Sequence, residues 1–187
     1  MSRREIRIAG FGGQGIILSG SIVGKAASIY NNGFAALTQS YGPESRGGSC
    51  RAEVVVSDKP VDYPYMVNPE VQIILSQEAY NEFGKNAPKG TFLIVDSDLV
   101  KVDPSQKPKP LSIPASRMAQ ELGRPVVANI IMMGFLATTS DIVSCEALKK
   151  AILNSVPPGT EDFNMKAFEL GYNYGIEHGR KVKNQSA

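Results

Sequence analysis

The sequence predicts a single α/β domain built around a mixed sheet. The chain opens on a strand-like segment that passes through a glycine turn into a helix-like segment. It contains 18 glycines and no tryptophan, a composition that favours many turns over a helical bundle. A chain of 187 residues buries one substantial core. We therefore expect one domain, over residues 5–183.

The N-terminal unit has the clearest pattern. Glu5–Gly10 alternates apolar and polar side chains and is predicted as a strand, and Ile16–Tyr30 has the apolar period of a helix. Between them lies the spacing G-x-G-x-x-G, in the segment RIAGFGGQGIILSG. Within the helix, Gly20, Gly24 and Ala27 are small. Each glycine there costs about 1 kcal/mol of helix propensity relative to alanine, which indicates a close approach of the helix to the sheet.

The next two predicted strands make the sheet mixed. They are Phe34–Gln39 and Arg51–Ser57, and the link between them reads SYGPESRGGSC. That link is too short and too rich in glycine to hold a crossover helix, so neighbouring strands here are expected to be antiparallel. The following stretch, Asp58–Pro69, contains three prolines and is predicted to be irregular.

The remainder of the chain alternates strands and helices. Residues 101–115 contain four prolines and are predicted as a proline-rich arm or linker within the domain. Asn129 and Ser144 are expected to cap the helices that follow them. The other predicted strands are Val71–Leu75, Thr91–Asp96 and Val126–Ala128, and the other predicted helices are Glu78–Asn86, Ala115–Leu122, Ile130–Ala137, Cys145–Asn154 and Met165–His178.

Charge and hydropathy exclude several classes of partner. The formal net charge is +2 and no basic run is long enough for a nucleic-acid stripe. Arg3 and Arg4 are not followed by the apolar region of a signal peptide, so the chain is expected to be cytoplasmic. The longest apolar stretch, Val126–Ala137, is shorter than the roughly 20 residues of a membrane span.

The residue types that usually carry catalysis or bind metals are sparse. Cys50 and Cys145 are far apart and have no other ligand at metal-binding spacing, so both are expected to be buried or half-buried thiols without a metal or a disulfide. His178 is the only histidine and is expected to be solvated at a helix end. Asp96 and Asp98 are interpreted as turn residues because no third ligand or activated nucleophile accompanies them. No catalytic residue is assigned.

We consider three interpretations of the glycine turn. It exposes the N–H groups of Gly13, Gln14, Gly15 and Ile16 at the positive end of a helix, where an anion binds well. A dinucleotide site requires an acid about 20 residues further on, and FAALTQSYG has none, although Arg46 could meet the 2′-phosphate of NADP. The alternatives are another phosphate-bearing ligand or a purely structural turn.

A second loop, SYGPESRGG, is expected beside the glycine turn. It concentrates Tyr41, Glu44 and Arg46 at the carboxyl end of the second strand. Because exposed ion pairs contribute only about 0–1 kcal/mol, stability is a weak reason for these charges. The functional interpretation of this loop is ligand binding or partner docking, and the alternative is a solvated turn.

Several segments together resemble the gamma subunit of the 2-oxoacid:ferredoxin (acceptor) oxidoreductases. They are GFGGQGIILSG, TQSYGPESRGG followed by CRAEVVVSD, DYPYMVNPEV, LSQEAY, LIVDSDLV and VPPGTEDFNMKAFELGY. The likeness runs from about residue 5 to 176, and YGPESRGG and DYP resemble the 2-oxoglutarate type more than the pyruvate type. The resemblance implies a three-layer α/β/α fold with a mixed, mostly parallel sheet.

The resemblance also implies a multi-subunit enzyme. Such an enzyme decarboxylates a 2-oxoacid on thiamine diphosphate, passes electrons through iron–sulfur clusters to ferredoxin or another acceptor, and transfers the acyl group to coenzyme A. With 2-oxoglutarate the products are succinyl-CoA and CO₂. The chain has no G-D-G motif for a thiamine diphosphate magnesium ion and no cysteine set for a cluster, so these cofactors are expected on alpha, beta and ferredoxin-like delta subunits. The alternative is a stand-alone phosphate-binding or NADP-binding protein.

Roles for the two loops follow from the resemblance. The second loop is expected to dock a sister subunit, and the glycine turn to contact a phosphate or coenzyme A. An isolated subunit is also expected to self-associate through apolar surface left for its partners. The residues concerned are Tyr41, Glu44 and Arg46 for docking, Gly12, Gly13, Gln14 and Gly15 for the phosphate, and Tyr63, Tyr65 and Met66 for self-association.

Overall fold

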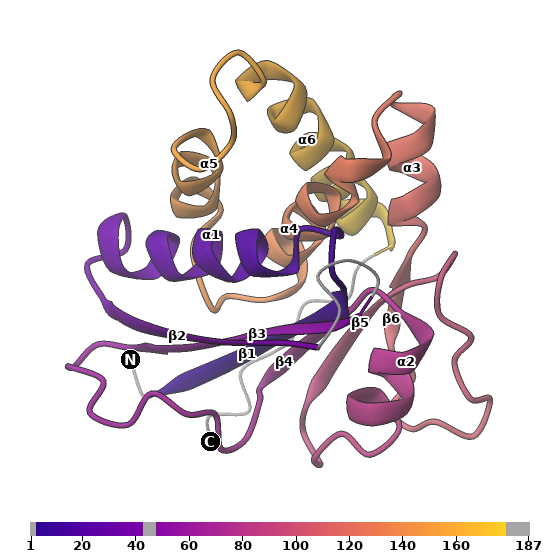
Figure 1. The fold of residues 1–187 in the computed structure, drawn as a ribbon, viewed down its shortest axis with the longest axis horizontal. Coiled ribbons are helices and arrows are strands. Elements are labelled where there is room, and N and C mark those ends of the chain that lie inside the picture. The colour runs from indigo at the N-terminus through magenta and orange to yellow at the C-terminus, as the bar shows by residue number, and fades with distance from the viewer. Residues whose placement is uncertain (1–2, 43–47, 179–187) are drawn as a thin grey trace.

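A computed structural model describes residues 3–42 and 48–178 and contains one six-stranded sheet, in the order β2-β3-β1-β4-β5-β6 (Figure 1). β3 is antiparallel to both of its neighbours, whereas β1, β4, β5 and β6 pair in parallel. The predicted mixed, mostly parallel sheet is therefore confirmed. The strands are β1 (Arg4–Phe11), β2 (Phe34–Tyr41), β3 (Ser49–Ser57), β4 (Val71–Ile74), β5 (Phe92–Asp96) and β6 (Leu111–Ile113).

The helices form two unequal layers. One face of the sheet is covered by α1, α3, α4, α5 and α6, and the other only in part, by α2 and the π-helical turn η1 that continues it (Figure 1). The helical elements are α1 (Ile16–Ile29), α2 (Gln77–Ala79), η1 (Tyr80–Gly84), α3 (Ala115–Glu121), the 3₁₀ turn η2 (Pro125–Val127), α4 (Ala128–Thr139), α5 (Cys145–Leu153) and α6 (Glu161–His178). No helix in these described ranges is long and apolar enough to cross a membrane.

Alternation along the strands divides the apolar side chains between two cores. Side chains such as Ile6, Ile8 and Val54 face the main helical layer and form the large core. Ala9 and Val95 face the other way and pack with Tyr80 of η1 in a small one. The core therefore lies mostly on the α1 side.

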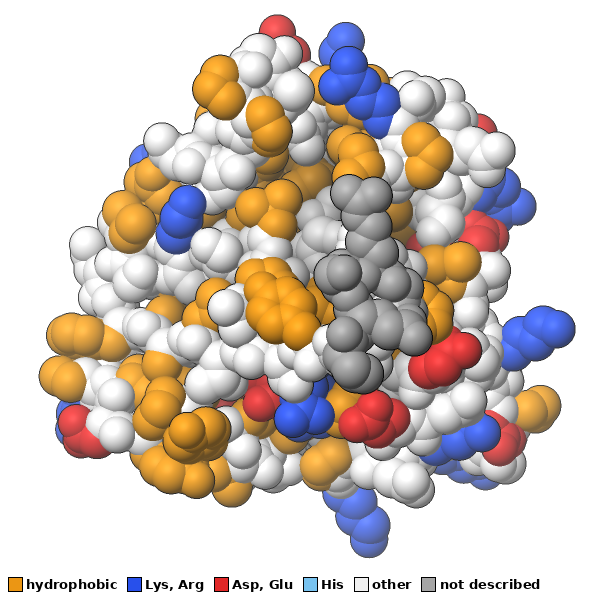
Figure 2. Space-filling view, viewed as in Figure 1, with side chains coloured by type: hydrophobic (Ala, Val, Ile, Leu, Met, Phe, Trp, Pro, Cys, Tyr) orange, Lys and Arg blue, Asp and Glu red, His pale blue; other side chains and the backbone are white. Residues whose placement is uncertain are grey.

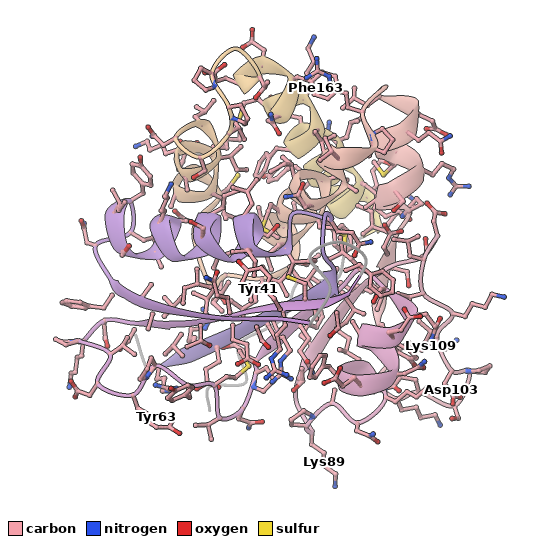
Figure 3. All side chains as sticks on the ribbon, in the orientation of Figure 1. Tyr41, Tyr63, Lys89, Asp103, Lys109 and Phe163 are labelled. Carbon is pink, nitrogen blue, oxygen red and sulfur yellow. The ribbon has the colours of Figure 1, made fainter. Side chains whose placement is uncertain are left out.

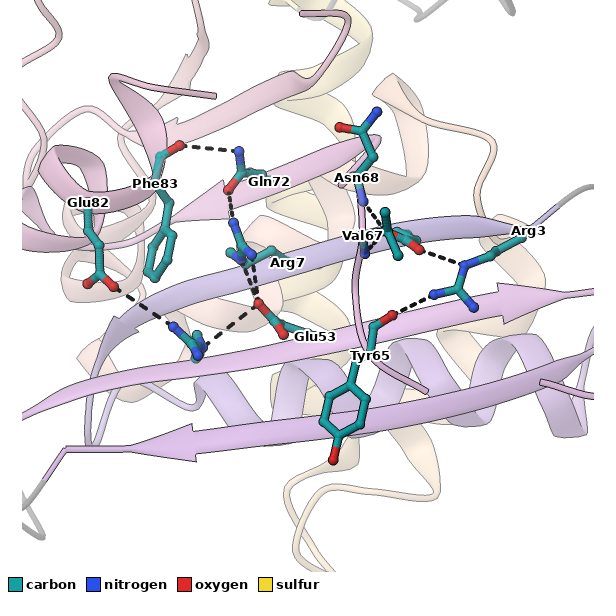
Figure 4. Close-up of polar contacts among 11 residues, drawn as sticks. Arg3, Arg7, Glu53, Tyr65, Val67, Asn68, Gln72, Glu82 and Phe83 are labelled. Atoms are coloured by element: carbon teal, nitrogen blue, oxygen red, sulfur yellow. Dashed lines mark hydrogen bonds and ion pairs between the residues drawn. The ribbon is translucent and has the colours of Figure 1, made fainter. Parts of the chain in front are cut away.

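The uncovered part of the second face carries a polar network on β1, β3 and β4 (Figure 4). Arg7 donates through Nε to Glu53 at 2.9 Å and through Nη1 to Gln72 at 3.1 Å. The Arg7 guanidinium also lies 4.5 Å from the ring centroid of Phe83 in η1. These contacts satisfy charged groups on a sheet face that helical elements cover only in part.

Helices α4 and α6 approach so closely that only glycine fits between them. A Cβ atom at Gly134 would overlap the carbonyl of Phe168, and one at Gly171 would overlap the carbonyl of Ile131. The long C-terminal helix is therefore packed backbone to backbone against the buried α4. It begins at Glu161, earlier than predicted.

Some local predictions are wrong for identifiable reasons. Val126–Ala128, predicted as a strand, falls in the η2 turn and the start of α4, because Pro125 lacks an N–H for a sheet and has the φ of a helix start. Asn129 is not a cap, since α4 already begins at Ala128. The predicted helix Glu78–Asn86 is the short α2 followed by η1. The arm predicted over 101–115 contains a strand, β6, that the pattern did not predict.

Other local predictions hold. The antiparallel pairing of β2 with β3 is confirmed. Ser144 caps α5 by accepting a hydrogen bond from the Ala147 N–H at 3.2 Å. Gly20 does let α1 approach the sheet, since a Cβ there would come within 2.6 Å of the Ala52 methyl, but Gly24 has room for one.

Candidate functional site at the glycine turn

The glycine turn joins the carboxyl end of β1 to α1 and has a backbone that only glycine adopts easily. Gly13 has φ +98° and Gly15 has φ +72°, both in the left-handed region. A Cβ on Gly15 would also overlap the side-chain amide of Asn129 in α4. The turn is thus held in one shape by its own backbone and by a neighbouring helix.

Gln14 holds the turn in shape through its side chain and its backbone. Its Oε1 accepts a hydrogen bond from the Phe11 N–H at 2.6 Å, and its Nε2 donates to the Leu75 carbonyl at 2.8 Å. The Gln14 N–H donates to the Phe11 carbonyl at 3.2 Å, and the Gly12 N–H to the Gly48 carbonyl at 2.9 Å. The prediction that the Gln14 N–H is free for a ligand is therefore wrong.

The other predicted donors have no hydrogen-bond partner among the described residues, although Ile16 as a residue is only 2% exposed. Across residues 3–42 and 48–178, the N–H groups of Gly13, Gly15 and Ile16 find no hydrogen-bond acceptor. The first turn of α1 contains no acidic residue and has no side-chain cap. A helix start without an acidic side chain or a side-chain cap has the electrostatic character that favours an anion.

Asn129 of α4 stabilises the turn through hydrogen bonds, a role that the sequence did not reveal. It is 3% exposed, and its Nδ2 donates to the Gly15 carbonyl and to Ser19 Oγ, both at 3.3 Å. Ser19 Oγ in turn donates to the Gly15 carbonyl at 3.0 Å. The available signal was a single amide in the apolar run VVANIIMMGF, because a buried amide requires a polar partner.

A hollow of about 290 Å³ opens beside the turn at the carboxyl edge of the parallel strands. Ser116, at the start of α3, lies on its far wall and donates through Oγ to the buried carboxylate of Asp96 at 2.7 Å. Asp96 also accepts from the Ser116 and Asp98 N–H groups, at 2.9 and 3.0 Å. The turn interpretation of the two aspartates is confirmed. The lining residues are Gly13, Gln14, Leu75, Ser116, Pro125, Val126 and Ala128.

Burial governs the titration of Asp96. It raises the pKa of this carboxyl above its ordinary value, and the hydrogen bonds from Ser116 and Asp98 oppose that effect. Within the described residues, no group of three His, Cys, Asp or Glu side chains could hold a metal ion. The hollow lies at the carboxyl edge of the parallel strands, the position where open α/β sheets generally bind ligands.

Residues 5–174 match the family model described as pyruvate ferredoxin/flavodoxin oxidoreductase. The chain belongs to this oxidoreductase family. It is 48% identical over 178 residues to the 2-oxoglutarate synthase subunit KorC of Methanocaldococcus jannaschii, covering 94% of this chain and 95% of that subunit. The resemblance found in the sequence is therefore confirmed.

Solved structures give the same fold. The gamma subunit of a keto/oxoacid ferredoxin oxidoreductase from Geobacter sulfurreducens superposes with a TM-score of 0.85 at 38% identity, covering 95% of this chain and 99% of that one. A 2-oxoglutarate:ferredoxin oxidoreductase from Magnetococcus marinus, with 2-oxoglutarate, coenzyme A and succinyl-CoA bound, has a TM-score of 0.83 at 22% identity. This chain covers only 32% of that chain, and we take the fold alone from it.

The second loop of this oxidoreductase-family chain is only partly described. Tyr41 closes β2 and is 61% exposed, on the helix side of the sheet (Figure 3). Glu44 and Arg46 lie outside the described residues. Their predicted docking role therefore stays a prediction.

The two thiols and the histidine of this family member lie away from the turn's hollow. Burial raises the pKa of Cys50 and also that of Cys145, which favours the less reactive thiol form. Both cysteines are free of disulfides. His178 stacks on Tyr174 with ring centroids 4.3 Å apart, at the exposed end of α6. None of the three lines the hollow.

Proposed function

We propose that this chain is the gamma subunit of a multi-subunit 2-oxoglutarate oxidoreductase. The observation that carries the proposal is the 48% identity to KorC over nearly the whole of both chains. The assembled enzyme converts 2-oxoglutarate and coenzyme A to succinyl-CoA and CO₂ and passes two electrons to ferredoxin or another acceptor. Thiamine diphosphate, magnesium and the iron–sulfur clusters belong to alpha, beta and ferredoxin-like delta subunits, and the gamma chain alone is inactive.

The glycine turn is the proposed contact for a phosphate of coenzyme A. The open N–H groups of Gly13, Gly15 and Ile16 support this role, because a hydrogen bond to a charged group contributes roughly 1.5–3 kcal/mol. Gly12 and Gln14 hold the turn in shape. The adjoining hollow offers apolar surface to the rest of such a ligand.

An exposed aromatic patch is the proposed contact for sister subunits. Tyr63 and Tyr65 are 57% and 60% exposed, and their ring centroids lie 5.6 Å apart. Tyr63 projects on the side of the sheet away from α1 (Figure 3). Val67 is more exposed still, whereas Met66, predicted to be part of this surface, is half-buried. Tyrosines in such surroundings are typical anchors of protein interfaces.

The backbone of this patch is fixed from β1 (Figure 4). Arg3 donates to the Tyr63 and Tyr65 carbonyls at 2.7 and 2.6 Å. The buried Glu5 accepts from the N–H groups of Val67 and Asn68 at 2.8 and 2.6 Å. The same surface, without its sister subunits, favours self-association of the isolated chain.

Reconstitution tests the proposal. The chain and its presumed sister subunits are co-expressed, and viologen reduction that depends on 2-oxoglutarate and coenzyme A is measured with and without the chain. We expect activity only in the complete assembly. Activity indifferent to omission of the chain, or turnover by the chain alone, contradicts the proposed function.

A further inference from the structure

The two edges of the sheet differ in how they are protected. β6 is three residues long and lies between Pro110 and Pro114. β2 is eight residues long, FAALTQSY, and contains neither a proline nor a charged side chain. Natural sheets protect exposed edges with short strands, prolines or charges, since an open edge pairs with other chains. The β6 edge is protected in this way and the β2 edge is not.

The open backbone groups of β2 can be assigned from the hydrogen-bond pattern. The Gly42 N–H donates to the Ser49 carbonyl at 2.7 Å, in register with the β2–β3 pairing. Hydrogen-bonded pairs alternate along an antiparallel ladder, so even-numbered residues of β2 bond to β3 and odd-numbered ones point outward. In the described part of the chain nothing bonds to these outward N–H and C=O groups, which belong to Ala35, Leu37, Gln39 and Tyr41.

The surface around this edge suits a protein contact. β2 lies at the front in Figure 1, and Figure 2, in the same view, shows mostly uncharged and hydrophobic surface across the middle of that side. Leu37 is 38% exposed although it projects toward α1. An uncharged edge strand places no like charges opposite one another when it meets a copy of itself.

We propose that β2 pairs antiparallel with β2 of a second copy of this chain, about a two-fold axis at Thr38. This rests on the proposed self-association of the isolated chain and gives it a second surface, the β2 edge, apart from the patch of Tyr63 and Tyr65. A two-fold axis normal to the sheet keeps the helices of both copies on the same side of the joined sheet. Directly opposed side chains then lie on the same face, so each odd-numbered residue faces an odd-numbered one and each even-numbered residue faces an even-numbered one. Centring on Thr38 places Leu37 opposite Gln39 and Ala35 opposite Tyr41, and every outward backbone group is paired.

Side chains also favour this register. Tyr41, the largest side chain of the odd set and 61% exposed, meets Ala35, the smallest. On the other side of the sheet Thr38 meets Thr38, a favourable cross-strand pair. A register centred on Leu37 would place Tyr41 opposite Gly33, beyond the end of the strand. This self-complementarity favours a second copy over a strand of a different protein.

Cysteine cross-linking of the full chain tests the register. Thr38 opposite Thr38 is a non-hydrogen-bonded pair with Cα atoms about 4.5 Å apart, within the range of a disulfide. In a Cys145→Ser background, Thr38→Cys is expected to form a disulfide-linked dimer under mild oxidation, whereas Leu37→Cys, which faces Gln39, is not. Linking of Leu37→Cys instead, or of neither variant, overturns the proposal.

Light scattering of the purified chain tests the interface without any introduced cysteine. Gln39→Pro removes an outward N–H and leaves the bonds to β3 intact, so we expect a folded monomer where the wild type is a dimer. The pair Tyr63→Ser and Tyr65→Ser tests the aromatic patch separately: a dimer that survives this pair supports the β2 interface, and a dimer that this pair abolishes but Gln39→Pro leaves intact overturns it. A wild-type monomer, or linking of Thr38→Cys only to a sister subunit, refutes the proposal. Neither assay needs turnover, so a dimer of the isolated chain, together with a reconstituted assembly that has no 2-oxoglutarate activity, would refute the proposed function alone.

Discussion

The side-chain amide of Gln14 donates to the Leu75 carbonyl at 2.8 Å and so ties the glycine turn to the end of β4. Its oxygen meanwhile accepts from the Phe11 N–H. One side chain therefore spans the two parallel strands at whose edge the hollow opens. The shape of the turn therefore depends on this side chain as well as on its glycines.

Replacing Gln14 by alanine is expected to destabilise the fold by about 1–3 kcal/mol, because it leaves the Phe11 N–H and the Leu75 carbonyl unpaired. Urea unfolding measures the change. Gln120→Ala, an exposed position in α3, is the control and should stay within about 0.5 kcal/mol of the wild type. Equal effects of the two substitutions would count against a structural role for Gln14.

Two substitutions at Gly13 distinguish the effect of a negative charge on anion binding from the effect of backbone strain. Gly13→Asp and Gly13→Asn impose similar strain at φ +98°, but only the aspartate places a negative charge beside the positive end of α1. If the turn binds a phosphate of coenzyme A, we expect the KM for coenzyme A in the assembled enzyme to rise about tenfold more with aspartate, a difference of about 1.4 kcal/mol. Equal KM values for coenzyme A in the two variants would contradict phosphate binding at the turn.

The contact between α4 and α6 should tolerate no added methyl group. Gly171→Ala is expected to cost about 3 kcal/mol or to prevent folding, since the methyl overlaps the Ile131 carbonyl. Gly24→Ala is the matched helical control, because its methyl would lie 4.0 Å from Ala35, and it should stabilise the chain by up to about 1 kcal/mol. Thermal unfolding of both variants checks the pair, and a stable Gly171→Ala protein contradicts the packing described.

The buried Asp96 should make stability depend on pH. Its pKa is raised in the folded protein, so the native state holds this proton more readily than the unfolded chain does. Its contribution is complete below the ordinary aspartate pKa of 3.8 and is lost as the pH rises through the raised value.

Asp96→Asn removes this titration. Unfolding free energies from about pH 4 to pH 7 should show the wild type losing its advantage over the variant as the pH rises. A difference that stays constant or widens with pH would contradict the raised pKa.

Local patterns were sufficient where neighbours in sequence determine structure. The β1–turn–α1 unit, the antiparallel β2–β3 pair and the Ser144 cap all follow from side chains within a few residues of one another. The prediction that Asp96 and Asp98 are turn residues holds for the same reason.

The sequence could not reveal interactions between distant segments. Asn129 looked like a cap because its hydrogen-bond partners, Gly15 and Ser19, lie more than a hundred residues away. β6 is only three residues long and depends on β5 for its pairing, so no periodicity could mark it. The Gln14 N–H counted as a ligand donor because its closure onto Phe11 depends on the turn's final shape.

The backbone of residues 63–68 is anchored by Arg3, at Tyr63 and Tyr65, and by Glu5, at the two residues after Met66, and this anchoring has a thermodynamic consequence. Ordering a flexible loop during association costs conformational entropy that weakens the complex. Here that ordering has already occurred during folding, so a partner meets a preorganised epitope. Complex formation through this patch should then proceed as rigid-body docking, with little loop rearrangement between the free and bound subunit.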